Sequence, residues 1–368
     1  MNILFLRPQP GIRSLKYALA FKNGGFDVNI IHGYTCKTLT EYYGYGDEYF
    51  KKFVKLDLEN LERDIRRVMK RYHIDLIHSH NAPDYLTVAA IRAVDDTPII
   101  HENQDTISLR KTPYSPGSFS GSDKESLLLN ERLANEQCDA RIHVTKEMLE
   151  YIWKKYGSKR DIVFYNYMSE SMIPTSFKEK MSKKDGQIHI VYEGSLSSFN
   201  DDHYDLAEIF EGIASHQLHI HICAANSNLD YKNLAEKNSF IHYHGHLDPR
   251  QLFEEITQYD FGWAGFNDAK NKPHMDVALP NKTMEYLACG LPTLSFPHKA
   301  QKSFIQKHGV GIVIEDLENL PEKLSDKNLL KNIRENIMRK RLQFTFEKNI
   351  DKIIDLYQDL ASGVKKST

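Results

Sequence analysis

The strongest constraint on the fold is a regular alternation of short apolar runs with amphipathic stretches, which occurs in both halves of the 368-residue chain. Short apolar runs bounded by glycine or proline are typical of buried strands, and apolar residues at helical spacing are typical of helices that cover a sheet. Strand–helix–strand order with short connections predicts a parallel sheet with helices on both faces. We therefore expect an α/β chain with two doubly wound parallel-sheet domains.

The predicted elements fall into two groups, one in each half of the chain. In the first half we expect strands at residues 2–6, 27–31, 75–80, 97–101, 140–144 and 161–165, and helices at residues 14–22, 58–72, 85–94 and 146–156. In the second half we expect strands at residues 187–194, 218–224, 239–245, 260–266, 291–296 and 309–314, and helices at residues 204–215, 249–258 and 282–289. A long charged helical pattern follows at residues 326–360.

A polar stretch at residues 169–186, which contains Pro174, interrupts the alternation and is typical of a linker. We therefore predict an N-terminal domain over residues 1–168 and a C-terminal domain over residues 187–343. Ligands of open α/β sheets bind beyond the carboxyl ends of the strands. Two such sheets that face a central cleft would bring their carboxyl-end loops around one large polar ligand.

The composition argues against several classes of protein. Lysine and arginine number 48 against 50 aspartate and glutamate, so the charge gives no reason to expect nucleic-acid binding. The four cysteines form no Cys-x-x-Cys pair, which argues against a zinc ribbon or a disulfide scaffold and fits a reducing cytosol. No signal peptide and no run of about 18 apolar residues is visible. We expect a cytoplasmic protein, with peripheral contact to the inner face of the membrane left open.

The segment ALPNKTMEYLACGLP encodes a short helix with two charged residues on one face. Pro280 and Asn281 mark its start, with Asn281 as the expected N-cap. Lys282 and Glu285 share a face at the N-terminal turn because they are one helical turn apart. A helix N-terminus attracts phosphate, the lysine adds positive charge, and the glutamate can accept hydrogen bonds from two ribose hydroxyls. A surface helix with a solvated Lys–Glu pair would show the same spacing.

Two loops of small residues follow the first predicted strand of each half. Gly11 lies in a Pro/Gly turn that opens a helix, although the turn is not a G-x-G-x-x-G dinucleotide motif. Gly194 and Ser195 follow the strand at residues 187–194, where a loop could pass close to a diphosphate. For the loop at Gly11 the alternative is an ordinary tight turn.

Histidines stand at the carboxyl ends of two predicted strands of the first half, in HSHN and HENQD. His80 and His101 are candidates to orient a hydroxyl or move a proton. A structural role is equally compatible with the pattern. His78 and His80 could share a strand face, but no third ligand at metal spacing stands nearby in the sequence, so we expect no zinc site there.

Several of these segments resemble the motifs of one enzyme family. DLIHSHN resembles a D-x-I-H-x-H strand, and FIHYHGHLDPRQLFEEITQYDFG resembles H-x-G-x-x-x-x-x-x-L-x-x-x-Y-x-x-A-D. LPNKTMEYLACGLPTLSF is close to a P-N-K-x-x-E-Y-x-A-x-G-x-P block. Over nearly its whole length the chain thus resembles GT-B fold glycosyltransferases, and specifically the retaining glycosyltransferase family four, also called group 1.

The resemblance implies two Rossmann-like domains that face a central cleft, an acceptor-side N-terminal domain and a nucleotide-sugar-binding C-terminal domain. It implies that the C-terminal helix, at about residues 344–362, crosses back to the first domain. It also implies that Glu285 binds the ribose, that Lys282 binds the diphosphate and that Gly11 lies near the reaction centre. The predicted nucleotide-sugar-binding residues are Gly11, Gly194, Ser195, Pro280, Asn281, Lys282 and Glu285, and the predicted catalytic residues are His80, His101 and Lys282.

The sequence departs from the family pattern at two positions that would contact the donor. Many relatives carry a glutamate eight positions before the ribose glutamate, whereas this chain has Val277 with Asp276 beside it. Relatives often carry an arginine after the first strand of the second domain, whereas this chain has Gly194-Ser195-Leu196-Ser197. Lys282 and backbone N–H groups are therefore the expected partners of the diphosphate.

We predict a glycosyltransferase that moves a sugar from a nucleotide-sugar to a hydroxyl of a glycan or glycolipid acceptor, with retention and without a metal or other cofactor. Preorganised donors would hold the charge of the leaving diphosphate. Two alternatives stay open, a nucleotide-sugar 2-epimerase and a non-catalytic nucleotide-sugar-binding protein. The Ser-, Pro- and Gly-rich segment at residues 107–124 could meet the acceptor, or be an ordinary surface loop. The basic, aromatic segment at residues 151–160 could touch an anionic membrane.

Overall fold

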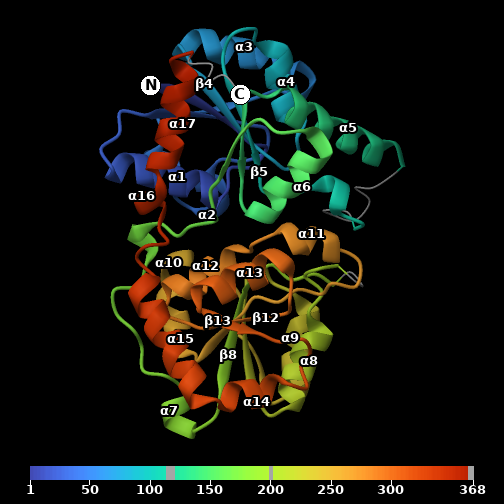
Figure 1. Ribbon diagram of the computed structural model, residues 1–368, viewed down its shortest axis with the longest axis vertical. Coiled ribbons are helices and arrows are strands. Elements are labelled where there is room, and N and C mark those ends of the chain that lie inside the picture. Colours follow the sequence, from blue (N-terminus) through green and yellow to red (C-terminus); the bar gives the residue numbers. More distant parts are fainter. Residues whose placement is uncertain (113–120, 199–201, 364–368) are drawn as a thin grey trace. The chain divides into compact units, whose positions relative to one another are not determined.

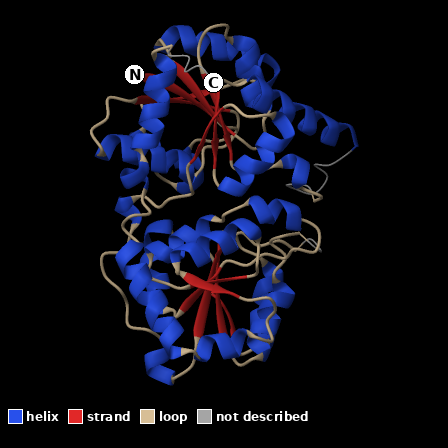
Figure 2. Cartoon of the chain, viewed as in Figure 1, coloured by secondary structure: helices blue, strands red, loops and turns tan. Residues whose placement is uncertain are grey.

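A computed structural model describes residues 1–112, 121–198 and 202–363. The chain divides into two compact units, of which the first contains the residues up to Tyr165 and those from Phe346 onward, and the second runs from Asn166 to Thr345. Each unit is a parallel sheet covered by helices (Figures 1 and 2). The prediction of an α/β chain with two doubly wound parallel sheets is therefore confirmed.

The first unit is built on a sheet with the strand order β3-β2-β1-β4-β5-β6-β7, all parallel among the described residues. Its strands are β1 (Asn2–Leu6), β2 (Asn29–Tyr34), β3 (Lys52–Lys55), β4 (Leu76–His80), β5 (Ile99–Asn103), β6 (Ala140–His143) and β7 (Arg160–Val163). The order reverses at β1, which pairs with β2 on one side and with β4 on the other. The loops at the carboxyl ends of β1 and β4 therefore lead to opposite faces, which is where such sheets bind ligands.

Helices cover both faces of this sheet, and the last of them comes from the end of the chain. The helices are α1 (Ile12–Asn23), α2 (Leu39–Tyr43), α3 (Leu61–Tyr72), α4 (Tyr85–Ala93), α5 (Gly121–Gln137), α6 (Lys146–Tyr156), α16 (Phe346–Asn349) and α17 (Asp351–Ala361), with three-ten turns η1 (Asp47–Tyr49), η2 (Leu58–Asn60) and η3 (Ile107–Leu109). Tyr357 of α17 lies with its hydroxyl 2.6 Å from Nδ1 of His78 in β4. This buried contact joins the C-terminal helix to the centre of the first sheet.

The second unit repeats the plan with the strand order β10-β9-β8-β11-β12-β13. Its strands are β8 (His189–Gly194), β9 (His219–Ala224), β10 (Ile241–Tyr243), β11 (Phe261–Trp263), β12 (Thr293–Ser295) and β13 (Gly311–Val313). Its helices are α7 (Ser182–Asp185), α8 (Ala207–Ser215), α9 (Leu229–Lys237), α10 (Pro249–Glu255), α11 (Lys272–Val277), α12 (Asn281–Ala288), α13 (Lys299–His308), α14 (Leu320–Ser325) and α15 (Lys327–Lys340), with η4 (Glu170–Met172) and η5 (Ile256–Gln258). Here the order reverses at β8, between β9 and β11.

Two expectations from the sequence need correction, and one strand was not predicted. The long helical pattern at residues 326–360 is not one helix, because the chain leaves α15, pairs Thr345 with Met168 and only then enters α16 and α17. The stretch expected to be a linker packs on the second unit, where the N–H of Met181 donates to the carbonyl of Gln258 at 3.0 Å. The edge strand β3 was not predicted, since its sequence KFVK is short and exposed at both ends.

Candidate active site

The predicted Lys–Glu helix is α12, and a buried tyrosine fixes it to the second sheet. The hydroxyl of Tyr286 donates to the carbonyl of Trp263 at 3.1 Å and accepts the N–H of Glu193 at 3.2 Å. The Tyr286 ring lies against Gly262, where any Cβ would come within 2.3 Å of the ring, so only glycine fits. These contacts hold α12 beside the carboxyl end of β8.

The expected N-cap of this helix was wrong. Pro280 is the N-cap, with φ −65° and ψ 150°, and Asn281 is already the first helical residue. Proline fixes φ at this value, which suits the extended residue that precedes a helix, so the helix starts one position earlier than predicted. The proline side chain has no acceptor, so it caps none of the N–H groups of the first turn, although the Pro280 carbonyl accepts the N–H of Thr283 at 3.2 Å. Asn281 is exposed and Pro280 is half-buried.

Lys282 lies at the centre of the candidate site at the carboxyl end of β8, in the second unit. Its side chain is only 7% exposed, and its Nζ lies 5.0 Å from the ring centre of Tyr192 and 5.2 Å from that of Tyr204. Burial lowers the pKa of Lys282, while the nearby carboxylates of Glu193 and Glu285 oppose the shift. A cation held between aromatic faces and carboxylates at a helix N-terminus is suited to meet a polyanionic ligand.

Gly194 and Ser195 lie where β8 ends, directly beside this lysine. Gly194 has φ +118°, and a Cβ there would lie 3.0 Å from Nζ of Lys282. Glycine is therefore required both by the backbone conformation and by the approach of the ammonium group. Ser195 is exposed, and its carbonyl accepts a hydrogen bond from the Tyr192 hydroxyl. The structure thus brings the two predicted segments, the β8 loop and the start of α12, into contact.

Two carboxylates accompany Lys282, and the sequence pointed to only one of them. Glu285 is 7% exposed and lies one helical turn after the lysine, as its spacing predicts. Glu193 is also 7% exposed, although it was not singled out. The sequence did contain an indication of Glu193. It is an acidic residue at the end of a strand whose apolar residues are otherwise continuous, directly before Gly194. Both carboxylates help to keep the buried lysine charged.

The region expected to contact the donor sugar has no free acid at the family position. Val277 is 8% exposed and ends α11. Oδ1 of the neighbouring Asp276 accepts from Nζ of Lys272 at 2.9 Å and from the N–H of Lys299 at 3.2 Å. These contacts tie Asp276 to its own helix and to the start of α13, so it does not simply replace the missing glutamate.

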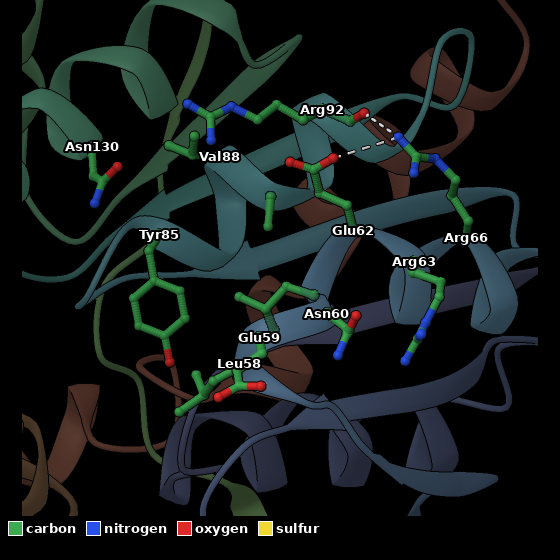
Figure 3. Close-up of a pocket in the computed structure, with 12 residues that line it drawn as sticks. Leu58, Glu59, Asn60, Glu62, Arg63, Arg66, Tyr85, Val88, Arg92 and Asn130 are labelled. Atoms are coloured by element: carbon green, nitrogen blue, oxygen red, sulfur yellow. Dashed lines mark hydrogen bonds and ion pairs between the residues drawn. The ribbon is translucent and has the colours of Figure 1, made fainter.

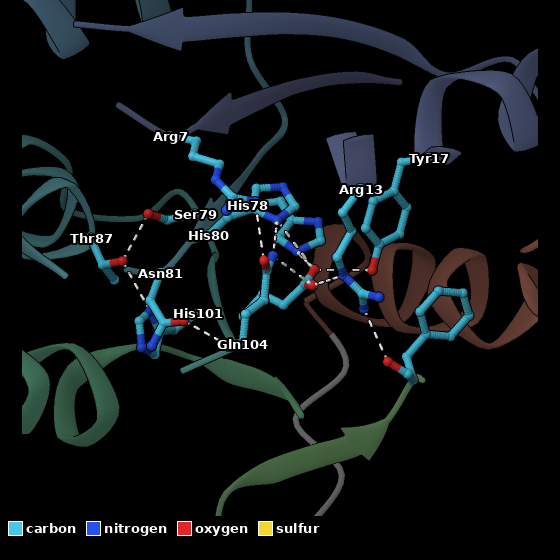
Figure 4. A network of polar contacts seen from close by, with 12 residues as sticks. Arg7, Arg13, Tyr17, His78, Ser79, His80, Asn81, Thr87, His101 and Gln104 are labelled. Carbon is cyan, nitrogen blue, oxygen red and sulfur yellow. Dashed lines mark hydrogen bonds and ion pairs between the residues drawn. The ribbon is translucent and has the colours of Figure 1, made fainter. Parts of the chain in front are cut away.

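A second polar centre lies in the first unit, around the fully buried carboxylate of Glu102 in β5. Figure 4 shows the side chains of Arg13, Tyr17, His78, His80 and Gln104 gathered in this centre. Burial by itself would raise the pKa of Glu102, but the Arg13 guanidinium and the histidines hold it well below its usual value. The groups that contact the carboxylate are Arg13 Nε, the Tyr17 hydroxyl at 3.0 Å, His78 Nε2 at 2.8 Å, His80 Nδ1 at 3.3 Å and Gln104 Nε2 at 3.1 Å. Sequence reasoning missed both Arg13 and Glu102, because only strand pairing brings α1 and β5 together.

The two predicted catalytic histidines of the first unit are fully buried at strand carboxyl ends. Burial, followed by the neighbouring His78, lowers the pKa of His80 to about 3, so its ring is neutral. His101 lies with Nδ1 3.0 Å from the Thr87 hydroxyl and Nε2 3.1 Å from Asp84 Oδ1. Both side chains are held by protein groups, so the contacts favour a structural role over an exposed catalytic group.

The ligand atoms of His78, His80 and Glu102 lie close enough together to bind a metal ion. Arg13 already neutralises the carboxylate, and Nδ1 of His78 is bound to the Tyr357 hydroxyl. The donor set therefore stabilises an arginine rather than a divalent cation.

Gly11 and Arg7 lie between the carboxyl end of β1 and the start of α1 in the first unit. Gly11 is the N-cap of α1 with ordinary extended angles, φ −117° and ψ 177°, so its conformation does not require glycine. A Cβ at Gly11 would lie 3.4 Å from Nη1 of Arg7, and Nη1 of Arg7 donates to Gln104 Oε1 at 3.0 Å. Arg7, which was not predicted, adds a half-buried positive charge beside the helix N-terminus.

A cavity of about 440 Å³ opens elsewhere in the first unit, between α3 and α4 (Figure 3). Its wall includes Tyr85 and Arg92 of α4, and Nη2 of Arg66 crosses it to the carbonyl of Arg92 at 2.8 Å. Among the described residues that line it there is no predicted site residue.

Of the two segments predicted to meet an acceptor or a membrane, the first, at residues 107–124, falls partly outside the described residues, and the second, at residues 151–160, lies within them. Residues 113–120 of the Ser-, Pro- and Gly-rich segment lie outside them, and the segment's end belongs to α5. Arg110, in the segment that could meet an acceptor or be an ordinary surface loop, is 5% exposed and donates to the carbonyl of Thr112. Trp153 of α6 is 43% exposed, but its Nε1 donates to Asp161 at 2.6 Å. No helix among the described residues is long and apolar enough to cross a membrane.

Family comparisons match both units. Residues 15–166 match the family described as Glycosyltransferase Family 4, and residues 206–343 match the family described as Glucosyltransferase 3-like, C-terminal domain. No curated protein matches the sequence.

Solved structures of similar fold cover nearly the whole chain. Sucrose-phosphate synthase from Thermosynechococcus elongatus is 13% identical with a TM-score of 0.71, over 99% of this chain and 100% of the other. HepE from Anabaena in complex with UDP-glucose is 15% identical with a TM-score of 0.67, over 97% and 100%. A putative UDP-N-acetylglucosamine 2-epimerase from Listeria monocytogenes is 12% identical with a TM-score of 0.65, over 99% and 98%.

The two sheets, the charged helix start at the end of β8 and these matches define the class of protein: the chain is a glycosyltransferase of the GT-B type. More particularly, its first unit carries a Glycosyltransferase Family 4 domain and its second unit a Glucosyltransferase 3-like C-terminal domain. The resemblance inferred from the sequence is confirmed.

Proposed function

We propose that this glycosyltransferase transfers a sugar from a nucleoside diphosphate sugar to a hydroxyl of a glycan or glycolipid, with retention and without a metal in the reaction. The observation that carries the proposal is the approach of Lys282 Nζ to Gly194 at the end of β8, where a Cβ would lie 3.0 Å from it, with Glu285 one turn later. HepE, which shares the fold, was solved with UDP-glucose. A uridine or related nucleoside diphosphate sugar is the donor class to test first.

In this proposal the start of α12 binds the nucleotide part of the donor. Glu285 accepts hydrogen bonds from the ribose hydroxyls, while Lys282 and the first-turn N–H groups of α12 bind the diphosphate. The exposed loop at Ser195, the half-buried Pro280 and the exposed Asn281 would border the same ligand. Because the lysine is already buried and oriented, it can stabilise the leaving diphosphate without reorganisation.

For the first unit we propose that His80 and His101 act as positioning residues for the carboxyl ends of β4 and β5. Both side chains are 0% exposed and bound to protein groups, so neither presents a nitrogen to solvent as it stands. Gly11 and Arg7 lie at the same end of the sheet and are better placed to meet a ligand. Loss of either histidine should therefore lower kcat through misplaced strand ends, with little change in the pH profile.

The site assignment is tested by calorimetry with nucleoside diphosphates. Lys282→Ala and Glu285→Ala should each weaken binding by about 10-fold or more, since a charge-assisted hydrogen bond contributes roughly 1.5–3 kcal/mol. The matched control is the exposed Lys–Glu pair of α15, Lys331→Ala and Glu335→Ala, whose charged atoms lie 4.0 Å apart. Unchanged affinity in the α12 variants, with a native circular dichroism spectrum, would contradict the assignment.

The reaction is tested by a screen of nucleoside diphosphate sugars with and without glycan acceptors. The expected result is release of nucleoside diphosphate that rises when an acceptor is added. The structural match to a putative 2-epimerase keeps that reaction as the second candidate. Its signature would be an altered free nucleotide-sugar formed without any acceptor, and that product would overturn the transferase proposal.

A further inference from the structure

Five histidines lie on one face of the second sheet, and two of them, His189 and His219, begin their strands. They are His189 of β8, His219 and His221 of β9, His242 of β10 and His244 just after it. Ring nitrogens of successive histidines lie within hydrogen-bond distance. His189 Nδ1 is 2.8 Å from His221 Nε2, and His221 Nδ1 is 2.9 Å from His244 Nε2. These three histidines form one row. His219 and His242 form a second row, in which His219 Nδ1 is 2.8 Å from His242 Nε2.

The outer nitrogens of the first two rings point to oxygen atoms at the edge of the sheet. Nε2 of His189 lies 3.0 Å from Oδ2 of Asp185, and Nε2 of His219 lies 2.6 Å from Oε1 of Gln187. The His189 and His219 rings are stacked, with centres 4.7 Å apart and an angle of 8° between their planes. Two imidazole nitrogens and two oxygens therefore face one small volume.

The carboxylate is held in position by the chain itself. Oδ1 of Asp185 accepts the backbone N–H of Gln187 at 2.9 Å, across the turn at Gly186, which has φ +76°. This bond leaves Oδ2 directed at His189. Asp185 is 41% exposed on its side chain and His219 is half-buried, so an ion can reach the group from solvent.

We propose that Asp185, His189 and His219, with Gln187 as a fourth ligand, form a binding site for one late first-row divalent metal ion such as Zn²⁺. The ligand atoms of the first three residues all lie within 4.8 Å of one another. Zinc bonds to imidazole nitrogen and carboxylate oxygen at about 2.0–2.2 Å, so small side-chain shifts would complete a tetrahedral set. Two nitrogens and two oxygens favour zinc and its neighbours over Mg²⁺ or Ca²⁺, which prefer oxygen alone.

The other histidines supply the outer contacts that such a site needs. Metal-bound histidines in proteins usually donate their second N–H to a fixed acceptor. With the metal on Nε2, His189 would donate from Nδ1 to His221, and His219 would donate from Nδ1 to His242. When the metal binds, every ring in both rows changes to its other neutral tautomer, so each ring still carries one proton. The rows can thus serve the metal-free and the metal-bound states without burying a charge.

The proposed metal lies far from the proposed donor site, so its role is structural. His189 begins β8 and Gly194 ends it, a span of about 17 Å at the usual rise of a strand. Figure 1 shows α7 and α12 at opposite ends of the second unit. The ion would link the end of α7 and the residues that follow it, through Asp185 and Gln187, to His219 at the start of β9. The inference does not depend on the proposed function.

The test uses the full chain without a histidine tag, cleared of metal by chelation and dialysis. Titration with ZnCl₂ against a chromophoric chelator, and with CoCl₂ followed by visible absorption, should give one site per chain. Zn²⁺ should also raise the unfolding temperature. Asp185→Asn and His219→Ala should each lower the Zn²⁺ affinity by about 10-fold to 100-fold or more. The matched control is His216→Ala, a half-buried histidine of the same unit outside the rows.

Each outcome decides the proposal. Loss of the cobalt band in Asp185→Asn and His219→Ala, with His216→Ala unchanged and native circular dichroism throughout, supports it. Absence of one-to-one binding by the unaltered chain, or unchanged affinity in Asp185→Asn, overturns it. If His219→Ala does not fold, Asp185→Asn decides alone, because this exposed residue can be changed without touching the core. Donor binding should be the same in Asp185→Asn as in the unaltered chain.

Discussion

At the scale of single residues, one carboxylate organises the centre of the first unit. Glu102 is fully buried and holds Arg13, which is 4% exposed, and it also receives contacts from Tyr17 and His78. A buried ion pair of this kind contributes little over apolar packing, but removal of one partner leaves the other charge uncompensated. The network therefore makes the first unit sensitive to acid.

Glu102→Gln should lower the free energy of unfolding at pH 7 by about 3–5 kcal/mol, because the Arg13 charge loses its counterion. The folded pKa of Glu102 lies below its unfolded value, so its contribution is complete above about pH 5 and is lost as the pH falls. The difference between variant and unaltered chain should shrink on going from pH 5 to pH 3. Urea unfolding at several pH values measures it, with the exposed Glu136→Gln as control. A constant difference across this range would contradict the prediction.

The residues of the donor site and of the polar centre in the first unit were predictable to different degrees. Lys282 and Glu285 share a face because helical spacing alone decides it, so the sequence was sufficient. Glu193 and Glu102 could not be found in this way, since each meets its partner only after strands far apart in sequence have paired. His80 and His101 were expected to be catalytic from residue type and strand position. The depth at which they are buried could be seen only in the fold.

At the scale of elements, α12 depends on its anchor more than on its own sequence. The helix has only eight residues, which is too short to be stable alone, and its N-cap is a proline without an acceptor. Tyr286 connects it to carbonyls of β8 and β11. The sequence predicted the helix but not this hydroxyl, because its acceptors belong to strands almost a hundred and about twenty positions away.

Tyr286→Phe should lower the free energy of unfolding by about 1–3 kcal/mol, since buried backbone groups lose their partner. It should also weaken nucleoside diphosphate binding, because the start of α12 would no longer be fixed beside β8. The control is Tyr243→Phe, which removes a hydroxyl bonded to the N–H of Asn228 at 2.9 Å on the far edge strand β10. That variant should change stability without changing affinity. Equal affinity losses in both variants would point to a general loosening of the unit.

At the scale of the whole molecule, the first unit is completed by residues that follow the second unit in sequence. Phe346 is fully buried, and its ring lies 5.0 Å from that of Tyr17 and 5.1 Å from that of Phe164. The alternation of strands and helices predicted both sheets. It also predicted a long helical pattern at residues 326–360 but not the break in it, because helical spacing continues through the chain's return from one unit to the other.

Phe346→Ala should destabilise the first unit by about 3–5 kcal/mol, the usual cost of removing a buried aromatic ring. The chain has two tryptophans, and Trp153 belongs to the first unit while Trp263 is fully buried in the second. In a Trp263→Phe background, the fluorescence transition of Trp153 should move to lower urea. In a Trp153→Phe background, the transition of Trp263 should stay in place. Equal shifts of both would contradict separate units.

The bond between Tyr357 and His78 joins positions that are 279 residues apart. On the ribosome the second unit, which ends at Thr345, has all its strands before that tyrosine is made. The first unit must therefore wait for most of translation without the helix that contacts His78 in β4. Nascent chains stalled before residue 346 should thus protect the later-made half from protease while leaving the earlier-made half open to cleavage, the reverse of the order of synthesis.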